Sequence, residues 1–466
     1  MNNIKMNVTL PEIEINEKNP FVNCQLGREK YANVLTQIVS RLYEGGVVAI
    51  NGKWGTGKTT FVRMWKQSLE NDGFKTLYFN VWQDDYISDP LIGLIAQMRN
   101  MCKTEDDNDR FSKLVDTASE ILASAVPAIF KGLTSKCLGD TCAEAVYDSI
   151  NNVVDGFKKE IENYQEQRNS VEGFCQLITK FVASFGSDKP VIFMVDELDR
   201  CNPSYAVKVL ERIKHLFDIP NVVFVLSIDK VQLCNSIRGY YGTDAINAEE
   251  YLQRFINLEY QLPEPNPETF CKYLYRHYQY DTFFTNCNYP LLEEGRLFES
   301  LSSRLFKKMN LTLREMDRIY AHMRLVLLSY DKRQMFQPAV LLLLIYIKEI
   351  DLYFYNQIKK RKLSLQEFID YFESNRFKDV FVFDNSNDHS ARQSLLVLVE
   401  LIYLYSSAGL ESQQFKVLSD DGKSLAFDCK VLDKEKILKN AHLFTLSYNS
   451  MPHLFAHVEL LTGLKE

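Results

Sequence analysis

Short apolar runs and longer stretches of helical spacing alternate along the first half of the chain. The apolar runs span residues 47–50, 76–82, 191–195 and 222–226. Runs of this length, rich in β-branched and aromatic residues, are typical of strands that a parallel sheet buries on both faces. Apolar residues at helical spacing in segments 34–42 and 203–217 predict helices that pack beside these strands. The pattern predicts an α/β fold with a parallel sheet.

The rest of the chain has a helical pattern. Between residues 103 and 185 strand signals are absent, which indicates a helical insertion within the sheet domain. Beyond the last strand we expect a helical segment at 263–335 and a helical C-terminal domain at 336–466. Because 466 residues exceed what one core usually holds, we divide the remainder into an N-terminal arm at 1–20 and a core at 21–262.

A glycine-rich octapeptide follows the first predicted strand and precedes a predicted helix. Gly52, Gly55 and Gly57 tolerate positive φ, so successive backbone amides can point at phosphate oxygens. Lys58 then reaches the β- and γ-phosphates, and the Thr59 hydroxyl is a ligand for Mg²⁺. The predicted nucleotide-binding residues are Gly52, Lys53, Trp54, Gly55, Thr56, Gly57, Lys58, Thr59 and Thr60. This order of strand, loop and helix predicts a P-loop NTPase core.

A pair of acidic residues ends the third predicted strand. Asp196 and Glu197 would lie at the carboxyl edge of a parallel sheet, beside the phosphate site. There Asp196 can hold the Mg²⁺ shell, and Glu197 can orient a water and take its proton. Ser227, at the end of the fourth run, either senses the γ-phosphate or simply terminates its strand. The alternative to the whole interpretation is an α/β protein whose glycine turn binds nothing.

Composition narrows the class of protein. The formal net charge of -7 argues against a large nucleic-acid surface. The 10 cysteines are scattered without CxxC pairs, so neither a zinc site nor a disulfide framework is indicated. Residues 1–18 are too polar for a secretory signal, and no stretch reaches the about 20 apolar residues of a transmembrane helix. The most apolar stretches, 121–130 and 340–347, fit buried or amphipathic helices, and we expect a cytoplasmic protein.

Four separate motifs carry a resemblance to a known family. They are Trp54 within the glycine-rich loop, the strand end at 80–83, the acidic run at 196–201 and the segment 251–256 before Leu262-Pro263. Together and in this order they resemble the KAP family of P-loop NTPases, over roughly residues 20–330. The resemblance implies that the nucleotide is ATP, bound with Mg²⁺.

The same resemblance suggests roles for single residues and for the whole protein. It implies Asp196 on Mg²⁺ and Glu197 as the hydrolytic base, although many members carry an aspartate where Glu197 stands. Members often have membrane-spanning helices between the two motifs, whereas the insertion here looks soluble, so membrane anchoring is not carried over. Bacterial relatives include proteins linked to phage exclusion, which makes antiviral defence an expectation.

Two arginines are candidate catalytic residues beside Glu197. Arg254 resembles the basic residue that related ATPases aim at a phosphate, and Arg314 resembles an arginine-bearing helix start that folds over the nucleotide as a lid. An aligned arginine offsets the charge that develops on the γ-phosphate. The alternatives are a surface salt bridge for Arg254 and an intrahelical pair with Asp317 for Arg314.

The C-terminal pattern leaves its role open. Leu395, Leu398, Val399 and Ile402 predict one apolar helix face, either packed on its own domain or presented to a partner. His453 and His457 have the spacing of a metal pair, but no glutamate follows His453, and we interpret them as ordinary histidines.

Three functions are compatible with these patterns. The first is an ATP-driven switch that reports its state to another subunit or an effector, through self-association or a partner protein. The second is a scaffold that holds ATP without hydrolysing it, and Glu197 argues against it because a scaffold needs no water-activating carboxylate. The third is a GTPase, for which the chain lacks an Asn-Lys-x-Asp element; Ser227-Ile228-Asp229-Lys230 does not supply it.

Overall fold

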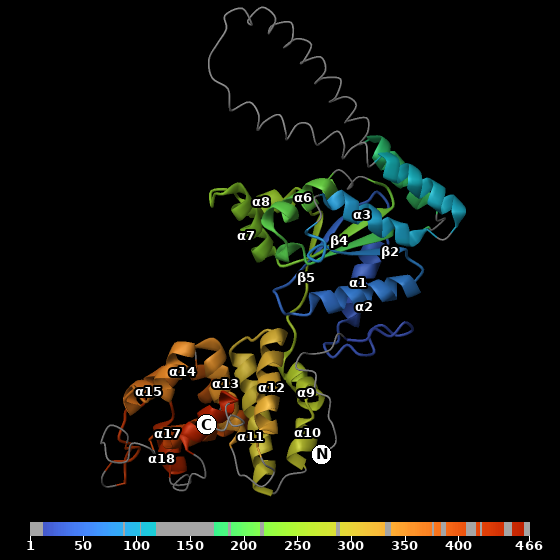
Figure 1. Ribbon diagram of the computed structural model, residues 1–466. Coiled ribbons are helices and arrows are strands. Elements are labelled where there is room, and N and C mark those ends of the chain that lie inside the picture. Colours follow the sequence, from blue (N-terminus) through green and yellow to red (C-terminus); the bar gives the residue numbers. More distant parts are fainter. Residues whose placement is uncertain are drawn as a thin grey trace, which may run out of the picture. The chain divides into compact units, whose positions relative to one another are not determined.

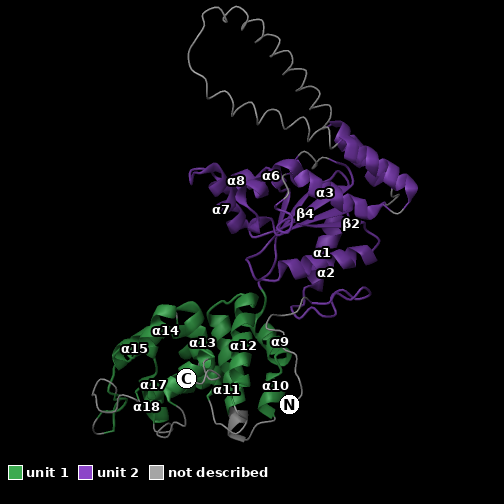
Figure 2. Cartoon of the chain, in the orientation of Figure 1, with its two compact units in different colours: residues 1–12, 265–466 green, residues 13–264 purple. Residues whose placement is uncertain are grey.

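Two compact units make up the chain (Figure 2). One comprises residues 13–264, here called the sheet unit, and the other is formed by residues 265–466, here called the helical unit. The computed structural model describes residues 13–86, 89–102, 104–117, 172–184, 188–214, 219–285, 289–330, 337–374, 377–383, 388–406, 416–419, 422–441 and 450–460. The finer division into arm, core, lid and C-terminal domain stays a prediction.

The sheet unit contains a five-stranded sheet in the order β2-β3-β4-β1-β5, in which every neighbouring pair is parallel. Its strands are β1 (Gly46–Asn51), β2 (Thr76–Asn80), β3 (Val191–Asp196), β4 (Val222–Ile228) and β5 (Leu258–Gln261). The predicted α/β fold with a parallel sheet is therefore confirmed. The predicted strand at 76–82 ends two residues early, because Val81 and Trp82 belong to a turn. The edge strand β5 was not predicted.

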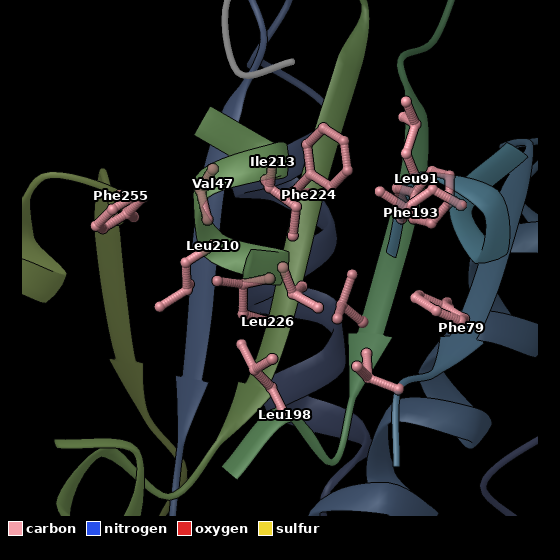
Figure 3. Close-up of a cluster of buried hydrophobic side chains, with 14 of the residues drawn as sticks. Val47, Phe79, Leu91, Phe193, Leu198, Leu210, Ile213, Phe224, Leu226 and Phe255 are labelled. Carbon is pink, nitrogen blue, oxygen red and sulfur yellow. The ribbon is translucent and has the colours of Figure 1, made fainter. Parts of the chain in front are cut away.

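Helices cover both faces of this sheet (Figure 1). On one face lie α1 (Glu29–Val39) and α2 (Lys58–Asn71); on the other lie α3 (Pro90–Met98), α6 (Pro203–Lys214), α7 (Lys230–Tyr241) and α8 (Ala248–Gln253). Successive residues of a strand point to opposite faces, so Val47 joins one core and Val48 the other. Figure 3 shows the core that Val47 joins, in which Phe193 and Phe224 stack at 5.3 Å. Burial on both faces explains the unbroken apolar strands.

Local signals account for several helix starts. Asp89 caps α3 by accepting the Leu91 amide, and Pro90 occupies the first helical turn, where no amide hydrogen is needed. The expected crossover helix is α6, between β3 and β4. The predicted apolar face of α1 is wrong in one member, because Val34 is 47% exposed while Ala32 is buried instead.

The predicted helical insertion is described only at its two ends. Residues 105–117 and 172–183 are helical, and both pack on the sheet through apolar side chains such as Leu114 and Phe181. The apolar stretch at 121–130 lies outside the described residues. In the part of the chain that the structure describes, no helix is both long and apolar enough to cross a membrane.

The helical unit consists mainly of α-helices. They are α9 (Pro267–His277), α10 (Tyr280–Thr285), α11 (Tyr289–Lys308), α12 (Leu313–Leu328), α13 (Pro338–Ile350), α14 (Leu352–Lys359), α15 (Leu365–Glu373), α16 (Lys378–Phe381), α17 (His389–Ser406), α18 (Lys434–Ala441) and α19 (Met451–Val458). Helix α11 packs against α13 and α17. The predicted apolar face of α17 is buried within the unit, which supports the interpretation that it packs on its own domain.

The two C-terminal histidines lie on α19. The ring of His457 is buried and stacks on Tyr330 with 3.6 Å between ring centroids, and its Nδ1 lies 2.8 Å from the Ser329 hydroxyl. His457 therefore packs in the core of the helical unit.

Candidate nucleotide-binding site

The glycine-rich loop connects β1 to α2 at the carboxyl edge of the sheet. Gly55 and Gly57 have φ of 75° and 83°, a left-handed conformation that side chains with a Cβ rarely adopt. Gly57 is the residue before α2, so the loop ends at the amino terminus of a helix, where free amides and the helix dipole favour an anion. The backbone is thus shaped as a phosphate cradle.

The Lys58 side chain folds back onto the glycine-rich loop. Its Nζ donates to the carbonyl oxygens of Gly52 at 2.5 Å and Lys53 at 3.2 Å, and its side chain is buried. Burial lowers the pKa of Lys58, while the nearby carboxylates of Asp199, Asp229 and Asp196 act in the opposite direction. The ammonium group is held by carbonyl oxygens, which are weaker partners than a phosphate.

A buried arginine that sequence reasoning missed supports the same loop. Arg28 is 3% exposed and donates to the carbonyl oxygens of Thr56 at 2.7 Å and Gly57 at 3.0 Å. Among the described residues it forms no ion pair with a carboxylate, and burial lowers the pKa of Arg28 to about 10. No sequence signal separates it from a surface arginine, because its contacts lie 28 and 29 positions away.

The two predicted acidic residues are both held by neighbours. Asp196 is buried and accepts hydrogen bonds from the Glu197 amide at 2.9 Å and the Tyr78 hydroxyl at 2.8 Å. Glu197 has φ of 63°, and one of its carboxylate oxygens pairs with Arg200. Its other oxygen accepts from the Asn80 side chain at 3.2 Å. Both oxygens of Glu197 are therefore engaged in this structure.

Ser227 lies between these groups, in the middle of the sheet. On β4 it pairs in register with Asp196 of β3 and with Ile50 of β1. The suggestion that it terminates its strand is wrong, because β4 continues to Ile228. Its hydroxyl is fully buried and has no hydrogen-bond partner among the residues that the structure describes. An unpaired buried hydroxyl costs free energy, so this position favours a ligand that would bond to it.

Trp54 ties the loop to the two adjacent strand ends. Its backbone amide donates to the Asp229 carboxylate at 3.0 Å, and its indole nitrogen donates to the Asp199 carboxylate. Both carboxylates are buried. The loop is therefore fixed by carboxylates that follow β4 and β3.

The two candidate arginines differ in their surroundings. Arg254 follows α8 and is exposed, and its side chain makes no hydrogen bond or ion pair with the described residues. Arg314 is exposed in the first turn of α12, in the helical unit. In the described part of the chain it does not pair with Asp317, whose carboxylate accepts from the Tyr278 hydroxyl at 2.6 Å. The catalytic roles of Arg254 and Arg314 stay predictions.

Comparison with known proteins agrees with this geometry. The model of the KAP family P-loop domain matches residues 28–329, about two thirds of the chain. The chain belongs to the KAP family. The match begins at Arg28, the buried arginine beneath the loop. Nucleotide binding by a P-loop is the property that this family implies.

One curated relative is the phage T7 exclusion protein of Escherichia coli strain K12. It is 21% identical over 250 residues, which cover 48% of this chain and 31% of the relative. The match thus spans about a third of that protein's length.

Solved structures provide a looser likeness. The ORC2 protein of Aeropyrum pernix, solved in ADPNP–ADP complexes, has 12% identity and a TM-score of 0.33, over 94% of this chain and 86% of that one. The ORC1 protein of the same organism, solved with DNA, has 13% identity and a TM-score of 0.25, over 93% and 94%. Because these identities and TM-scores are low, the fold is defined by the strand order of the sheet and not by the similarity to these structures.

Proposed function

We propose that the sheet unit binds ATP with Mg²⁺ and hydrolyses it, and that the chain acts as a nucleotide-driven switch. The observation that carries the proposal is the unpaired Ser227 hydroxyl. It lies in register with Asp196 on one side and with the strand that leads into the glycine-rich loop on the other. A γ-phosphate bound at this edge would give the hydroxyl the partner it lacks.

Charge at the site fits a polyphosphate. Arg28 and Lys58 are buried cations held by carbonyl oxygens of the loop, and α2 begins there. Burying Arg28 without a carboxylate partner among the described residues is costly, and a bound phosphate would lower that cost. Thr59 and Asp196 are the residues that would hold Mg²⁺, which offsets charge on the phosphate oxygens when bound.

Glu197 is the residue that would accept the proton of the attacking water. Its carboxylate oxygens are engaged by Arg200 and Asn80, so one of these contacts must open before it can act as a base. This requirement supports slow turnover that resets a switch, and a partner could speed turnover by releasing Arg200 from Glu197.

Phosphate release tests the proposal directly. With ATP and Mg²⁺, Lys58→Ala should lose ATP binding and turnover, whereas Glu197→Gln should keep binding and lose about 10²- to 10⁴-fold in turnover. Lys208→Ala and Glu44→Gln remove exposed side chains of the same two types in the same unit and serve as matched controls. Equal turnover in Glu197→Gln and the parent would remove Glu197 from the mechanism.

A scaffold that holds ATP without turning it over is the second candidate. It shares the cradle and the buried cations, and it predicts that the parent and Glu197→Gln bind ATP equally and both fail to release phosphate. Competition of ATP binding by GTP measures the base preference, which rests on the family resemblance alone.

A role in excluding phages follows from the name of the relative. The alignment with this relative, at 21% identity, covers 48% of this chain, so the proposal concerns the aligned part only. Expression in Escherichia coli followed by challenge with phage T7 would test it. We expect fewer plaques with the parent than with Lys58→Ala, and equal plaque numbers would contradict the proposal.

A further inference from the structure

Trp54 is fastened at two points, and each point belongs to a different strand end. The backbone amide of Trp54 is bound by Asp229, which caps α7 directly after β4. Its indole nitrogen is bound by Asp199, which lies in the turn after β3. Trp54 is the third residue of the glycine-rich loop, so these bonds fix the loop before its phosphate-facing amides begin.

Asp199 is an unusual partner for an indole. It is 5% exposed and forms no ion pair among the described residues. Burial raises the pKa of Asp199, while the charge of Lys58 and the bond from Trp54 act against this. Conversely, Asp199 is the strongest of the carboxylates that raise the pKa of Lys58. Asp199 therefore accepts a hydrogen bond from the loop at Trp54, and its charge also acts on the pKa of Lys58.

We propose that Trp54 and Asp199 form a tether that holds the glycine-rich loop ready for phosphate. A loop already fixed in its bound conformation loses less conformational freedom when the ligand arrives. Asp199 is a positioning residue in this scheme, because it acts on the nucleotide through Trp54. The inference rests on the proposed nucleotide binding, and it adds that the glycine-rich loop is fixed in its binding conformation before the nucleotide arrives.

Hydrogen exchange of the nucleotide-free protein tests the tether independently of ATP. Trp54→Phe keeps an aromatic ring and removes the donor, and Asp199→Ala removes the acceptor. Each should speed amide exchange in residues 52–60 by about 10-fold, the effect of losing one hydrogen bond to a charged group. The double variant should exchange no faster than either single variant, because both remove the same bond.

ATP titration then tests the effect on the nucleotide. Trp54→Phe and Asp199→Ala should each weaken ATP affinity about 10-fold. Asp199→Asn should not weaken it, because asparagine retains an oxygen that can accept the indole hydrogen and removes a negative charge that faces the phosphates. Opposite outcomes for asparagine and alanine distinguish a tether from general damage to the fold.

Trp65→Phe is the matched control. Trp65 lies in the same unit and donates its indole hydrogen to the Thr36 hydroxyl at 2.9 Å. Its substitution removes a bond of the same type without changing exchange in residues 52–60. Unfolding in urea identifies any variant that fails to fold. If Asp199→Ala fails to fold, Trp54→Phe and Asp199→Asn still allow the test.

The outcomes separate the two proposals. Unchanged loop exchange in Trp54→Phe and Asp199→Ala, or effects that add in the double variant, would overturn the tether. Faster loop exchange in a protein that does not bind ATP would leave the tether in place and refute the proposed nucleotide binding.

Discussion

Arg304 of the helical unit and Arg28 of the sheet unit are both buried and are satisfied in different ways; the helical unit buries a further arginine, Arg324, whose guanidinium lies over the Phe283 ring. Arg304 of the helical unit pairs with the Asp388 carboxylate at 2.8 Å, and both side chains are largely buried. Its remaining donors bond to the carbonyl oxygens of Asp379, Val380 and Val382. Arg28 of the sheet unit has two carbonyl partners and no carboxylate among the described residues. The first charge is paired with a carboxylate, and the second is bonded to carbonyl oxygens alone.

Two buried serines repeat the contrast. The Ser302 hydroxyl in the helical unit donates to the Glu299 carbonyl at 3.0 Å and lies 2.8 Å from the Tyr320 hydroxyl. Ser227 in the sheet unit is equally buried and has no partner among the described residues; Ser394 of the helical unit also has none, but only Ser227 lies in register with the strand that leads into the glycine-rich loop. A buried polar group that is hydrogen-bonded stabilises a fold. A buried polar group without a partner costs stability, and such a cost is tolerated at a site where a ligand bonds to the group.

Substituting the two arginines with methionine should produce the largest difference. Arg304→Met removes the buried charge that neutralises the Asp388 carboxylate and should cost about 3–5 kcal/mol of stability. Arg28→Met removes two bonds to carbonyl oxygens but also an uncompensated charge, so its stability should change by less, about 1 kcal/mol. Urea unfolding without nucleotide measures both.

The stabilisation by bound ATP should be affected more by Arg28→Met than by Arg304→Met. Arg304→Met should keep the full stabilisation that saturating ATP gives the sheet unit, and Arg28→Met should lose most of it because the phosphates lose a buried cation. If Arg28→Met retained the ATP-dependent stabilisation, Arg28 would be a structural residue like Arg304.

Substituting the two serines with alanine tests the same contrast with a smaller effect. Ser302→Ala leaves the buried Tyr320 hydroxyl short of a partner and should cost about 1–3 kcal/mol. Ser227→Ala removes an unpaired hydroxyl and should leave the free protein unchanged or about 1 kcal/mol more stable. ATP turnover should fall only in Ser227→Ala. A loss of stability in Ser227→Ala without nucleotide would show that the hydroxyl has a partner within the protein.

Much of the sheet could be predicted because its strands are buried on both faces. The short apolar runs at β1, β3 and β4 are rich in β-branched residues, which favours strands over a buried helix, and the glycines of the loop at 52–59 indicate its backbone conformation. Strand β5 was missed because it lies at the sheet edge with most of its residues exposed, including Leu258 at 38%. Its pattern therefore lacks the apolar run that marked the other strands.

The supporting residues of the site could not be predicted for a different reason. Arg28, Asp199 and Asp229 act through contacts that join distant parts of the chain, such as the bond between Trp54 and Asp229 across 175 positions. Charged residues are usually exposed, so composition gives no sign that these three are buried. Sequence motifs identified the groups that would touch the nucleotide, and the fold identified the groups that hold them.

Protonation of His457 should cost the helical unit stability in acid, and this is the smallest effect that we predict. Burial lowers the pKa of His457 from 6.5 to about 4, and His453 adds repulsion. A histidine with a lowered pKa in the folded state contributes stability that is present above pH 6.5 and is lost as pH falls through 4. At pH 5 we expect a loss of about 1 kcal/mol.

The 3 tryptophans allow this loss to be assigned to one unit. Trp54, Trp65 and Trp82 all belong to the sheet unit, so tryptophan fluorescence reports that unit while circular dichroism reports mainly helices. Glu294 and Glu400 of the helical unit act in the opposite direction, because burial raises the pKa of both carboxyls. The loss is therefore measured as a difference between two proteins. Between pH 7 and pH 5 the dichroism midpoint in urea should fall in the parent relative to His457→Phe, which keeps a ring against Tyr330 and cannot take a proton, and the fluorescence midpoints of the two should change equally. His389→Phe, at an exposed position, should follow the parent. Equal changes in the parent and His457→Phe would assign the acid sensitivity to another group.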